Sequence, residues 1–186
     1  MKILFATEKP FAPAAVNGIK KSAEAEVHEV VLLEKYTDKQ QLLDAVKDAD
    51  AMIVRSDKIT KEVLDAATRL KIVVRAGAGY DSIDTAYAKE KGIVVENTPG
   101  QNSNAVAELA IAMMIFMSRN QFTPATGSEI QGKTLGIQAF GNVGRLVGAK
   151  AAALGMNVKA MDPFLTAELI KAGGAEPAGS LEELYS

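Results

Sequence analysis

A glycine-spaced turn follows an apolar segment in the second half of the chain. In TLGIQAFGNVG, residues 134 to 144, Ala139, Gly141 and Gly144 have the spacing of turns that bind the pyrophosphate of a dinucleotide. Glycine normally fills all three places, for the tight turn, for close approach of the backbone to pyrophosphate, and for helix–strand packing. Alanine at the first place weakens the match. The alternative is an ordinary strand-to-helix turn that only packs well.

The segments around this turn favour a dinucleotide site. A helical pattern follows, so Asn142 and Val143 at its start would offer free N–H groups and partial positive charge to a phosphate. The next apolar run ends at Asp162, 18 residues beyond Gly144. A carboxylate there can accept hydrogen bonds from the adenosine ribose hydroxyls and would repel a 2′-phosphate. The order of strand, turn, helix, strand and acid therefore predicts NAD rather than NADP.

A second cluster is cationic and rich in glycine. Arg55 and Arg75 each end an apolar run, in IVRS and VVRAGAGYD. Ligands of open α/β sheets gather at the carboxyl ends of strands, and backbone N–H groups without large side chains can cradle a carboxylate. We expect an anionic substrate, with a carboxylate and a phosphate, near these two guanidinium groups. The alternative is that each arginine pairs with a surface acid such as Asp57 or Asp81.

The first half of the chain alternates short apolar runs with helical patterns. The apolar runs are continuous, as in strands whose two faces are both covered. Alternating β and α units imply a parallel sheet with right-handed crossovers. Thr60 with Glu62 predicts a helix start, and Gly92 predicts a helix end. A complete doubly wound domain is expected over residues 1–98, with strands at 2–7, 28–33, 51–56, 71–77 and 92–97 and helices at 15–25, 38–49, 60–70 and 84–92.

The second half begins with a break rich in Pro, Gly and Asn, NTPGQNSN at 97–104. The helix expected after it, over 105–120, is apolar almost all round, which predicts burial on most sides. It is either a core or linking helix or a subunit-interface helix. Beyond a loop at 121–132, the pattern predicts strands at 133–140 and 157–162, helices at 143–155 and 166–174, and a last helix that starts with a capping box of Ser180 and Glu183.

Composition excludes several classes of function. The 186 residues carry a net charge of −2, so no basic surplus points to nucleic acid. There are no cysteines, which excludes disulfides, thiolate catalysis and Cys-based metal sites. The longest apolar stretch, 105–117, contains Glu108 and is shorter than the ~20 residues of a membrane span. We expect a cytoplasmic protein without a signal peptide, and no role for the single histidine, His28.

Five segments carry a resemblance to a known family. They are LLEKYTDKQQLLDAVKDADAMIVRSDKIT, LKIVVRAGAGYDSID, GIVVENTPGQNSNAVAELAIAMM, GKTLGIQAFGNVGRLVGAKAAALGMNVKAMDPF and LEELYS. In this order and spacing the chain resembles the D-isomer-specific 2-hydroxyacid dehydrogenases, and most closely their short D-3-phosphoglycerate dehydrogenase branch. The resemblance covers essentially all of the chain and implies NAD-dependent oxidation of a small anionic 2-hydroxy acid, 3-phospho-D-glycerate, in serine biosynthesis.

The resemblance also implies an architecture and a set of site residues. It implies an α/β protein with a flavodoxin-like doubly wound substrate-binding domain over 1–98. A linking helix and the first part of a Rossmann-type NAD-binding domain would then follow over 99–186. Together with the motifs above, it predicts substrate binding by Arg55, Ser56, Arg75, Gly77, Ala78, Gly79 and Asn102, and NAD binding by Ala139, Gly141, Asn142, Val143, Gly144 and Asp162.

The end of the chain departs from the family. Its members continue with an arginine, an acid and a histidine that takes the hydroxyl proton, and none of these can be assigned here. Because hydride transfer from an alcohol needs a general base, we expect this chain alone to be inactive. The alternative is a noncatalytic, anion-binding half-protein. With only two strands expected in the second domain, the strand at 157–162 would be an unpaired edge, and this edge or the apolar helix would form a homodimer.

Overall fold

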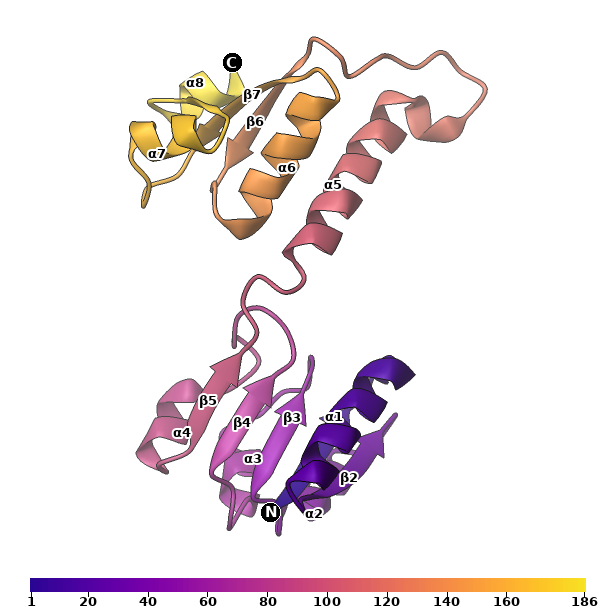
Figure 1. Ribbon diagram of the computed structural model, residues 1–186, viewed down its shortest axis with the longest axis vertical. Helices are drawn as coiled ribbons and strands as arrows, with labels where there is room; N and C mark the ends of the chain where they lie inside the picture. Colours follow the sequence, from indigo (N-terminus) through magenta and orange to yellow (C-terminus); the bar gives the residue numbers. More distant parts are fainter. The chain divides into compact units, whose positions relative to one another are not determined.

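The protein consists of two compact units, Met1–Pro99 and Gly100–Ser186 (Figure 1). The structure is a computed structural model and describes all residues from Met1 to Ser186. Each unit has its own parallel sheet and its own hydrophobic core. Each is therefore described by itself.

The first unit contains a five-stranded parallel sheet in the order β2-β1-β3-β4-β5. This is the strand order of flavodoxin-like folds, so the predicted fold is confirmed. The strands and helices are β1 (Lys2–Thr7), α1 (Pro13–Ala25), β2 (Glu29–Glu34), α2 (Lys39–Val46), β3 (Ala51–Val54), α3 (Lys61–Ala66), β4 (Ile72–Arg75), α4 (Thr85–Glu90) and β5 (Val94–Asn97).

The core of the first unit lies around β1, β3 and β4. Leu4, Met52 and Val73 on these strands are fully buried, as the continuous apolar runs predict. Helices cover them with a further set of buried residues that includes Leu42, Val46, Val63 and Leu64. This packing fixes the carboxyl ends of the strands, where the predicted arginines lie.

Local signals set the helix ends only in part. Gly92 follows α4 with a φ of +72°, the left-handed conformation that favours glycine, so the predicted helix end is confirmed. Thr60 precedes α3 and Glu62 lies in the first turn, but the Thr60 hydroxyl makes no capping hydrogen bond. Ser180 accepts from the Glu183 N–H, whereas the Glu183 carboxylate binds the Gly179 N–H. The predicted capping box is therefore half formed.

The second unit contains a three-stranded parallel sheet in the order β6-β7-β8. This matches the first three strands of a Rossmann-type sheet, which confirms the predicted fold. The elements are α5 (Ser103–Ser118), the 3₁₀ helix η1 (Asn120–Phe122), β6 (Thr134–Gln138), α6 (Asn142–Ala153), β7 (Asn157–Met161), α7 (Ala167–Ala172), β8 (Glu176–Pro177) and α8 (Leu181–Tyr185).

Strand β8 was not expected, and it changes which edge of the sheet is open. It is only two residues long and contains proline, which argues against a strand in sequence patterns. Because β7 pairs with both β6 and β8, the prediction of an unpaired edge at 157–162 is wrong. The Ala139 N–H and the Lys133 carbonyl oxygen bind β7. Successive residues of a strand point their backbone groups to opposite sides, so every second residue of β6 points its groups away from β7. The open edge of the sheet is therefore this side of β6, which has no neighbouring strand.

Helix α5 is less covered than its composition predicts. Only Ser103 and Ala107 are buried, and α5 packs along α6 within the second unit. The expectation of burial on most sides is therefore wrong for the single chain. The exposed large apolar side chains of α5 are Val106, Leu109, Met113, Phe116 and Met117. No helix in the structure has both the length and the apolar character needed to cross a bilayer.

Candidate functional site

The turn between β6 and α6 has a backbone that demands small residues. Ala139 has a φ of +76°, in the left-handed region where glycine is favoured. A Cβ on Gly144 would lie 2.3 Å from the Ala139 carbonyl oxygen, so no side chain fits there. A Cβ on Gly141, in contrast, would meet nothing within 4 Å. Close packing of the turn therefore excludes a side chain at Gly144, whereas the space beside the Gly141 Cα is open.

The start of α6 presents unpaired donors to that open space. Gly141 is the N-cap and offers no side chain to the helix. The first N–H with an acceptor in the chain is that of Arg145, which binds the Gly141 carbonyl oxygen, so the N–H groups of Asn142, Val143 and Gly144 are free. Free N–H groups and the helix dipole together suit a phosphate anion. The predicted cofactor residues Ala139, Gly141, Asn142, Val143 and Gly144 thus form one turn that fits a pyrophosphate.

Asp162 lies at the end of β7, beside the same turn. Its Oδ2 accepts from the Phe140 N–H at 2.8 Å, and its Oδ1 accepts from the Phe164 N–H at 2.9 Å. These bonds fix the carboxylate against the turn. A carboxylate has about four acceptor sites, so it can still accept from ribose hydroxyls. The structure therefore brings Asp162 together with the glycine-spaced turn, as the sequence predicts.

The two predicted arginines end neighbouring strands of the first unit. Arg75 is the last residue of β4 and pairs in register with Val54, the last residue of β3. Its Nε donates to the Arg55 carbonyl oxygen at 3.0 Å, and its Nη1 donates to the Gly79 carbonyl oxygen at 3.2 Å. Arg55 is exposed, and its guanidinium makes no hydrogen bond within the chain. Arg75 therefore joins the end of β3 to the glycine-rich loop.

The glycine-rich loop offers fewer free donors than expected. The Gly77 N–H binds the Arg75 carbonyl oxygen, whereas the N–H groups of Ala78 and Gly79 have no acceptor in the chain. Gly77 has a different importance, because a Cβ there would lie 3.3 Å from the Arg75 guanidinium carbon. The predicted three-amide cradle is thus reduced to two amides, and Gly77 leaves room for Arg75.

The alternative in which the arginines pair with surface acids is wrong. No salt bridge in the structure involves Arg55 or Arg75. Asp57 is buried and binds the Arg55 backbone N–H, while Asp81 and the Arg75 guanidinium both lie beside Gly79 without forming a salt bridge. Guanidinium groups with no carboxylate partner remain available to an anionic ligand.

The remaining predicted residues lie in different places. Ser56 follows Arg55 and is exposed in the first unit, whereas Asn102 is the N-cap residue of α5 in the second unit. His28 directly precedes β2, so it lies at the opposite end of the sheet from the arginines. No group of three or more His, Asp or Glu side chains is placed to hold a metal ion.

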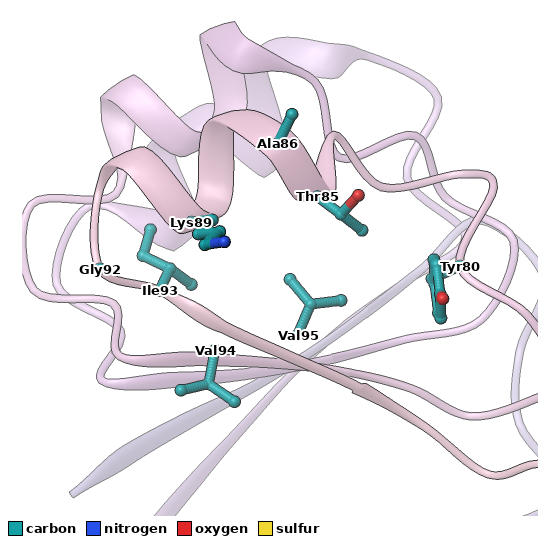
Figure 2. Close-up of a pocket in the computed structure, with 8 residues that line it drawn as sticks. All are labelled: Tyr80, Thr85, Ala86, Lys89, Gly92, Ile93, Val94 and Val95. Carbon is teal, nitrogen blue, oxygen red and sulfur yellow. The ribbon is translucent and has the colours of Figure 1, made fainter.

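A pocket of about 650 Å³ lies elsewhere in the first unit, between α4 and β5 (Figure 2). Figure 2 shows Val95 pointing from β5 toward α4, with Tyr80 at one end of the hollow. The lining is mostly apolar and contains none of the predicted site residues: Tyr80, Thr85, Ala86, Lys89, Gly92, Ile93, Val94 and Val95. This pocket therefore shares no lining residue with the cluster of arginines and glycines, although Tyr80 directly follows Gly79.

Comparison with known proteins identifies the family. The family described as D-isomer specific 2-hydroxyacid dehydrogenase, catalytic domain, matches residues 4–185. The chain belongs to this family. Among the relatives of this chain, D-3-phosphoglycerate dehydrogenase of Methanocaldococcus jannaschii is 39% identical over 160 residues, 78% of this chain and 30% of that protein. Hydroxypyruvate reductase of Thermotoga maritima is 38% identical over 149 residues, 73% of this chain and 49% of that protein.

Solved structures give the same relationship. The NAD⁺-bound 3-phosphoglycerate dehydrogenase of Entamoeba histolytica superposes with a TM-score of 0.91 at 49% identity, covering 100% of this chain and 59% of that chain. The NAD-dependent formate dehydrogenase of Staphylococcus aureus, in complex with NAD, superposes with a TM-score of 0.79 at 28% identity, covering 100% and 62%. The chain thus spans under half the length of the two curated relatives and about three fifths of these two structures.

Proposed function

We propose that residues 1–98 bind the substrate and residues 99–186 bind NAD in an NAD-dependent dehydrogenase of small anionic 2-hydroxy acids. The family match and the superposition on two NAD-bound dehydrogenases support this proposal. The free N–H groups at the start of α6 would hold the pyrophosphate. Asp162 would accept from the adenosine ribose and disfavour NADP.

The substrate that we propose is 3-phospho-D-glycerate. The observation that carries this choice is the pair of guanidinium groups at neighbouring strand ends, neither of which has a carboxylate partner. Two cations suit a ligand with both a phosphate and a carboxylate. The names of similar proteins point to the same substrate. Arg55, Arg75 and Ser56 would bind the anionic groups, and the amides of Ala78 and Gly79 would orient the carboxylate.

The chemistry would be oxidation at C2 of the substrate. When bound, NAD supplies the hydride acceptor. The protein residues named above neutralise the substrate charge and hold its carboxylate, and Asn102 is proposed to line the substrate on the nicotinamide side. The hydroxyl proton needs a general base, and the sole histidine lies at the wrong end of its sheet. We therefore propose that the 186-residue chain binds ligands but transfers no hydride, and NADH formation from 3-phosphoglycerate by the purified chain would contradict this.

Calorimetric titration tests the substrate assignment. We expect 3-phosphoglycerate to bind more tightly than D-lactate, because D-lactate lacks the phosphate. Removing the free guanidinium with Arg55→Ala should weaken 3-phosphoglycerate about tenfold, since a charge-assisted hydrogen bond contributes ~1.5 kcal/mol or more. Arg119→Ala, an exposed arginine of the second unit, is the matched control and should change nothing. Equal affinities for both acids, or no effect of Arg55→Ala, would contradict the proposal.

A second candidate function is a noncatalytic module that forms a homodimer. Exposed apolar side chains on α5 favour it, with Leu109 60% and Met113 58% exposed in the single chain. The open side of β6 offers another pairing edge. Light scattering distinguishes the two contacts, because Leu109→Glu should give monomers only if α5 forms the interface. A wild-type chain that is strictly monomeric would exclude both.

A further inference from the structure

Asp57 is a buried carboxylate with no cationic partner. Its side chain is only 3% exposed, and it takes part in no salt bridge. Three donors hold it instead. Oδ1 accepts from the Tyr36 hydroxyl at 2.6 Å and the Glu8 N–H at 2.9 Å, and Oδ2 accepts from the Arg55 N–H at 3.3 Å. Because an unpaired buried carboxylate is costly, these hydrogen bonds must keep it in place.

The three donors come from the ends of three neighbouring strands. Glu8 follows β1, Tyr36 follows β2, and Arg55 follows β3, and the sheet order is β2-β1-β3. In flavodoxin-like sheets the crevice between β1 and β3 is where the strand order reverses and where ligands enter. Here the Asp57 carboxylate bridges that crevice, and the free arginine, Arg55, lies at its β3 side.

Tyr36 is a permanent donor in this group. Burial raises the pKa of its hydroxyl well above the ordinary value, and the hydrogen bond to Asp57 raises it further. The phenol therefore keeps its proton at every physiological pH. The donor set on Asp57 is complete whenever the domain is folded.

Two hydrogen bonds hold the backbone of Arg55, one on its N–H and one on its carbonyl oxygen. Its N–H binds Asp57 Oδ2, and its carbonyl oxygen accepts from Arg75 Nε at 3.0 Å. The guanidinium of Arg55, in contrast, has no partner in the chain. We propose that Asp57 is a positioning residue that, with Arg75, fixes the backbone of Arg55 and so aims its guanidinium at the substrate anion. This proposal rests on the anion site of the proposed function.

Charge and position have opposite effects on anion binding here. A negative carboxylate near an anion site weakens anion binding by Coulomb repulsion, so removing only the charge would strengthen binding. Loss of the backbone geometry that orients the Arg55 guanidinium would instead weaken anion binding. The sign of the change in Asp57→Asn therefore separates a positioning residue from a mere local charge.

Asparagine at this position breaks one selected bond. Its single carbonyl oxygen can keep the two donors on the Oδ1 side, from Tyr36 and Glu8. The amide NH₂ then faces the Arg55 N–H, donor against donor, and the peptide must move. Tyr36→Phe removes one donor and keeps the charge. These two variants therefore weaken the same network by different routes.

The chain provides a matched control on its surface. The Tyr87 hydroxyl donates to Asp65 Oδ1 at 2.6 Å, the same distance as in the Tyr36–Asp57 pair, but this second pair is exposed and lies on α3 and α4. Asp65→Asn and Tyr87→Phe repeat the same chemical changes away from the arginines. They control for general effects of losing an Asp–Tyr hydrogen bond.

The experiment combines calorimetry and amide exchange on the full 186-residue chain. For 3-phosphoglycerate we expect about tenfold weaker binding by Asp57→Asn and about threefold by Tyr36→Phe, as for one lost hydrogen bond of ordinary strength. Asp65→Asn and Tyr87→Phe should bind like wild type, and NAD affinity should be unchanged in all four. By NMR, the Arg55 amide should exchange more slowly than the unpaired Ala78 amide in wild type, and lose that protection in Asp57→Asn.

Each other result overturns a specific claim. Unchanged or tighter binding by Asp57→Asn and Tyr36→Phe, with wild-type affinity that depends on Arg55, overturns the positioning role and leaves the proposed function intact. A lowered unfolding temperature with unchanged affinity does the same. If wild-type affinity for 3-phosphoglycerate does not depend on Arg55, the proposed function fails. Independently of affinity, an Arg55 amide that exchanges as fast as the Ala78 amide in wild type overturns the positioning role. If Asp57→Asn does not fold, Tyr36→Phe decides between the same outcomes.

Discussion

The two units present groups for anions by opposite means. In the first unit the cations are side chains, Arg55 and Arg75, held by hydrogen bonds at the ends of β3 and β4. In the second unit the donors are backbone N–H groups at the start of α6, and a side chain on Gly144 would clash with the turn. One site depends on which side chains are present, and the other depends on their absence.

This difference has consequences for specificity. Guanidinium groups can discriminate ligands by charge and by geometry, so the first unit is suited to choosing a substrate. A helix N-terminus binds any phosphate that reaches it, and specificity there must come from a neighbour such as Asp162. A substitution that keeps the positive charge but changes the geometry of the donors should therefore weaken ligand binding by the first unit. A substitution that adds volume to the turn should weaken ligand binding by the second unit.

The largest effect is expected from adding one methyl group to the turn in the second unit. Gly144→Ala places Cβ 2.3 Å from a carbonyl oxygen, so the turn must shift, at a cost of about 3 kcal/mol in unfolding free energy. NAD binding should be lost, while 3-phosphoglycerate binding by the first unit remains. Thermal unfolding and calorimetry on the same sample measure both.

Gly141→Ala is the paired variant. Its φ is −80° and its Cβ meets no protein atom, so the unfolding free energy should fall only by the N-cap preference for glycine over alanine, about 1 kcal/mol or less. The methyl group nevertheless enters the space proposed for the pyrophosphate, so NAD affinity should fall. Equal NAD affinities for wild type and Gly141→Ala would show that the cofactor does not approach this residue.

The next effect tests whether charge alone suffices in the first unit. Arg75→Lys keeps the positive charge but cannot span both the Arg55 and Gly79 carbonyl oxygens with a planar fork. We expect about tenfold weaker binding of 3-phosphoglycerate, roughly 1.4 kcal/mol, and unchanged NAD affinity. Titration of both ligands checks this, and full 3-phosphoglycerate affinity in the lysine variant would mean that only the charge matters.

A smaller effect is expected from restoring glycine to the turn. Ala139 holds a φ of +76°, which costs an L-residue roughly 1 kcal/mol relative to glycine. Ala139→Gly should raise the unfolding free energy of the second unit by about that amount without changing the first. Chemical denaturation followed by amide signals from each unit would detect the gain. No change would mean that the turn relaxes around alanine.

The smallest effect is a difference in acid stability between the units. In the first unit the pKa of Asp50 is lowered by hydrogen bonds from the Lys2 N–H and Arg69, and the pKa values of Asp44, Asp48 and Asp65 are lowered by side-chain hydrogen bonds. In the second unit only the pKa of Glu168 is lowered. Because folded pKa values lie below the unfolded ones, this stabilisation is full above about pH 4 and is lost as the pH falls through the folded values.

We therefore expect acid to destabilise the first unit more than the second. Amide signals followed during an acid titration would show the first unit losing structure at the higher pH. Asp44, Asp48 and Asp65 are exposed, so salt should reduce their part of the difference, whereas Asp50 is buried and should be screened less. Simultaneous loss of both units, or earlier loss of the second, would contradict the assignment.

The repeating strands and helices could be predicted from the sequence because local signals agree with the fold. Continuous apolar runs located five strands of the first unit, and Gly92 and Gly155 end helices with φ of +72° and +82°. Helix α3 ends at Ala66 rather than near residue 70, where Leu70 turns into the core. Strand β8 was missed because two residues with a proline carry no strand pattern.

The candidate site was only partly predictable. Strand ends placed the arginines beside each other, and the turn placed Asp162 against Gly141 and Gly144. Sequence spacing could not show that Asp57 binds the Arg55 backbone rather than its guanidinium, because either contact would join the same two residues, two positions apart in the sequence. It also could not show that the Gly77 N–H is occupied by Arg75. Such contacts depend on side-chain direction, which periodicity does not encode.

The most direct test maps both ligands on the labelled chain by NMR. Titration with 3-phosphoglycerate should shift the amide signals of Arg55, Ala78 and Gly79, and titration with NAD should shift those around Gly141–Gly144 together with Asp162. If either ligand instead shifts residues outside its group, or shifts none, the separation into a side-chain site and a backbone site is contradicted.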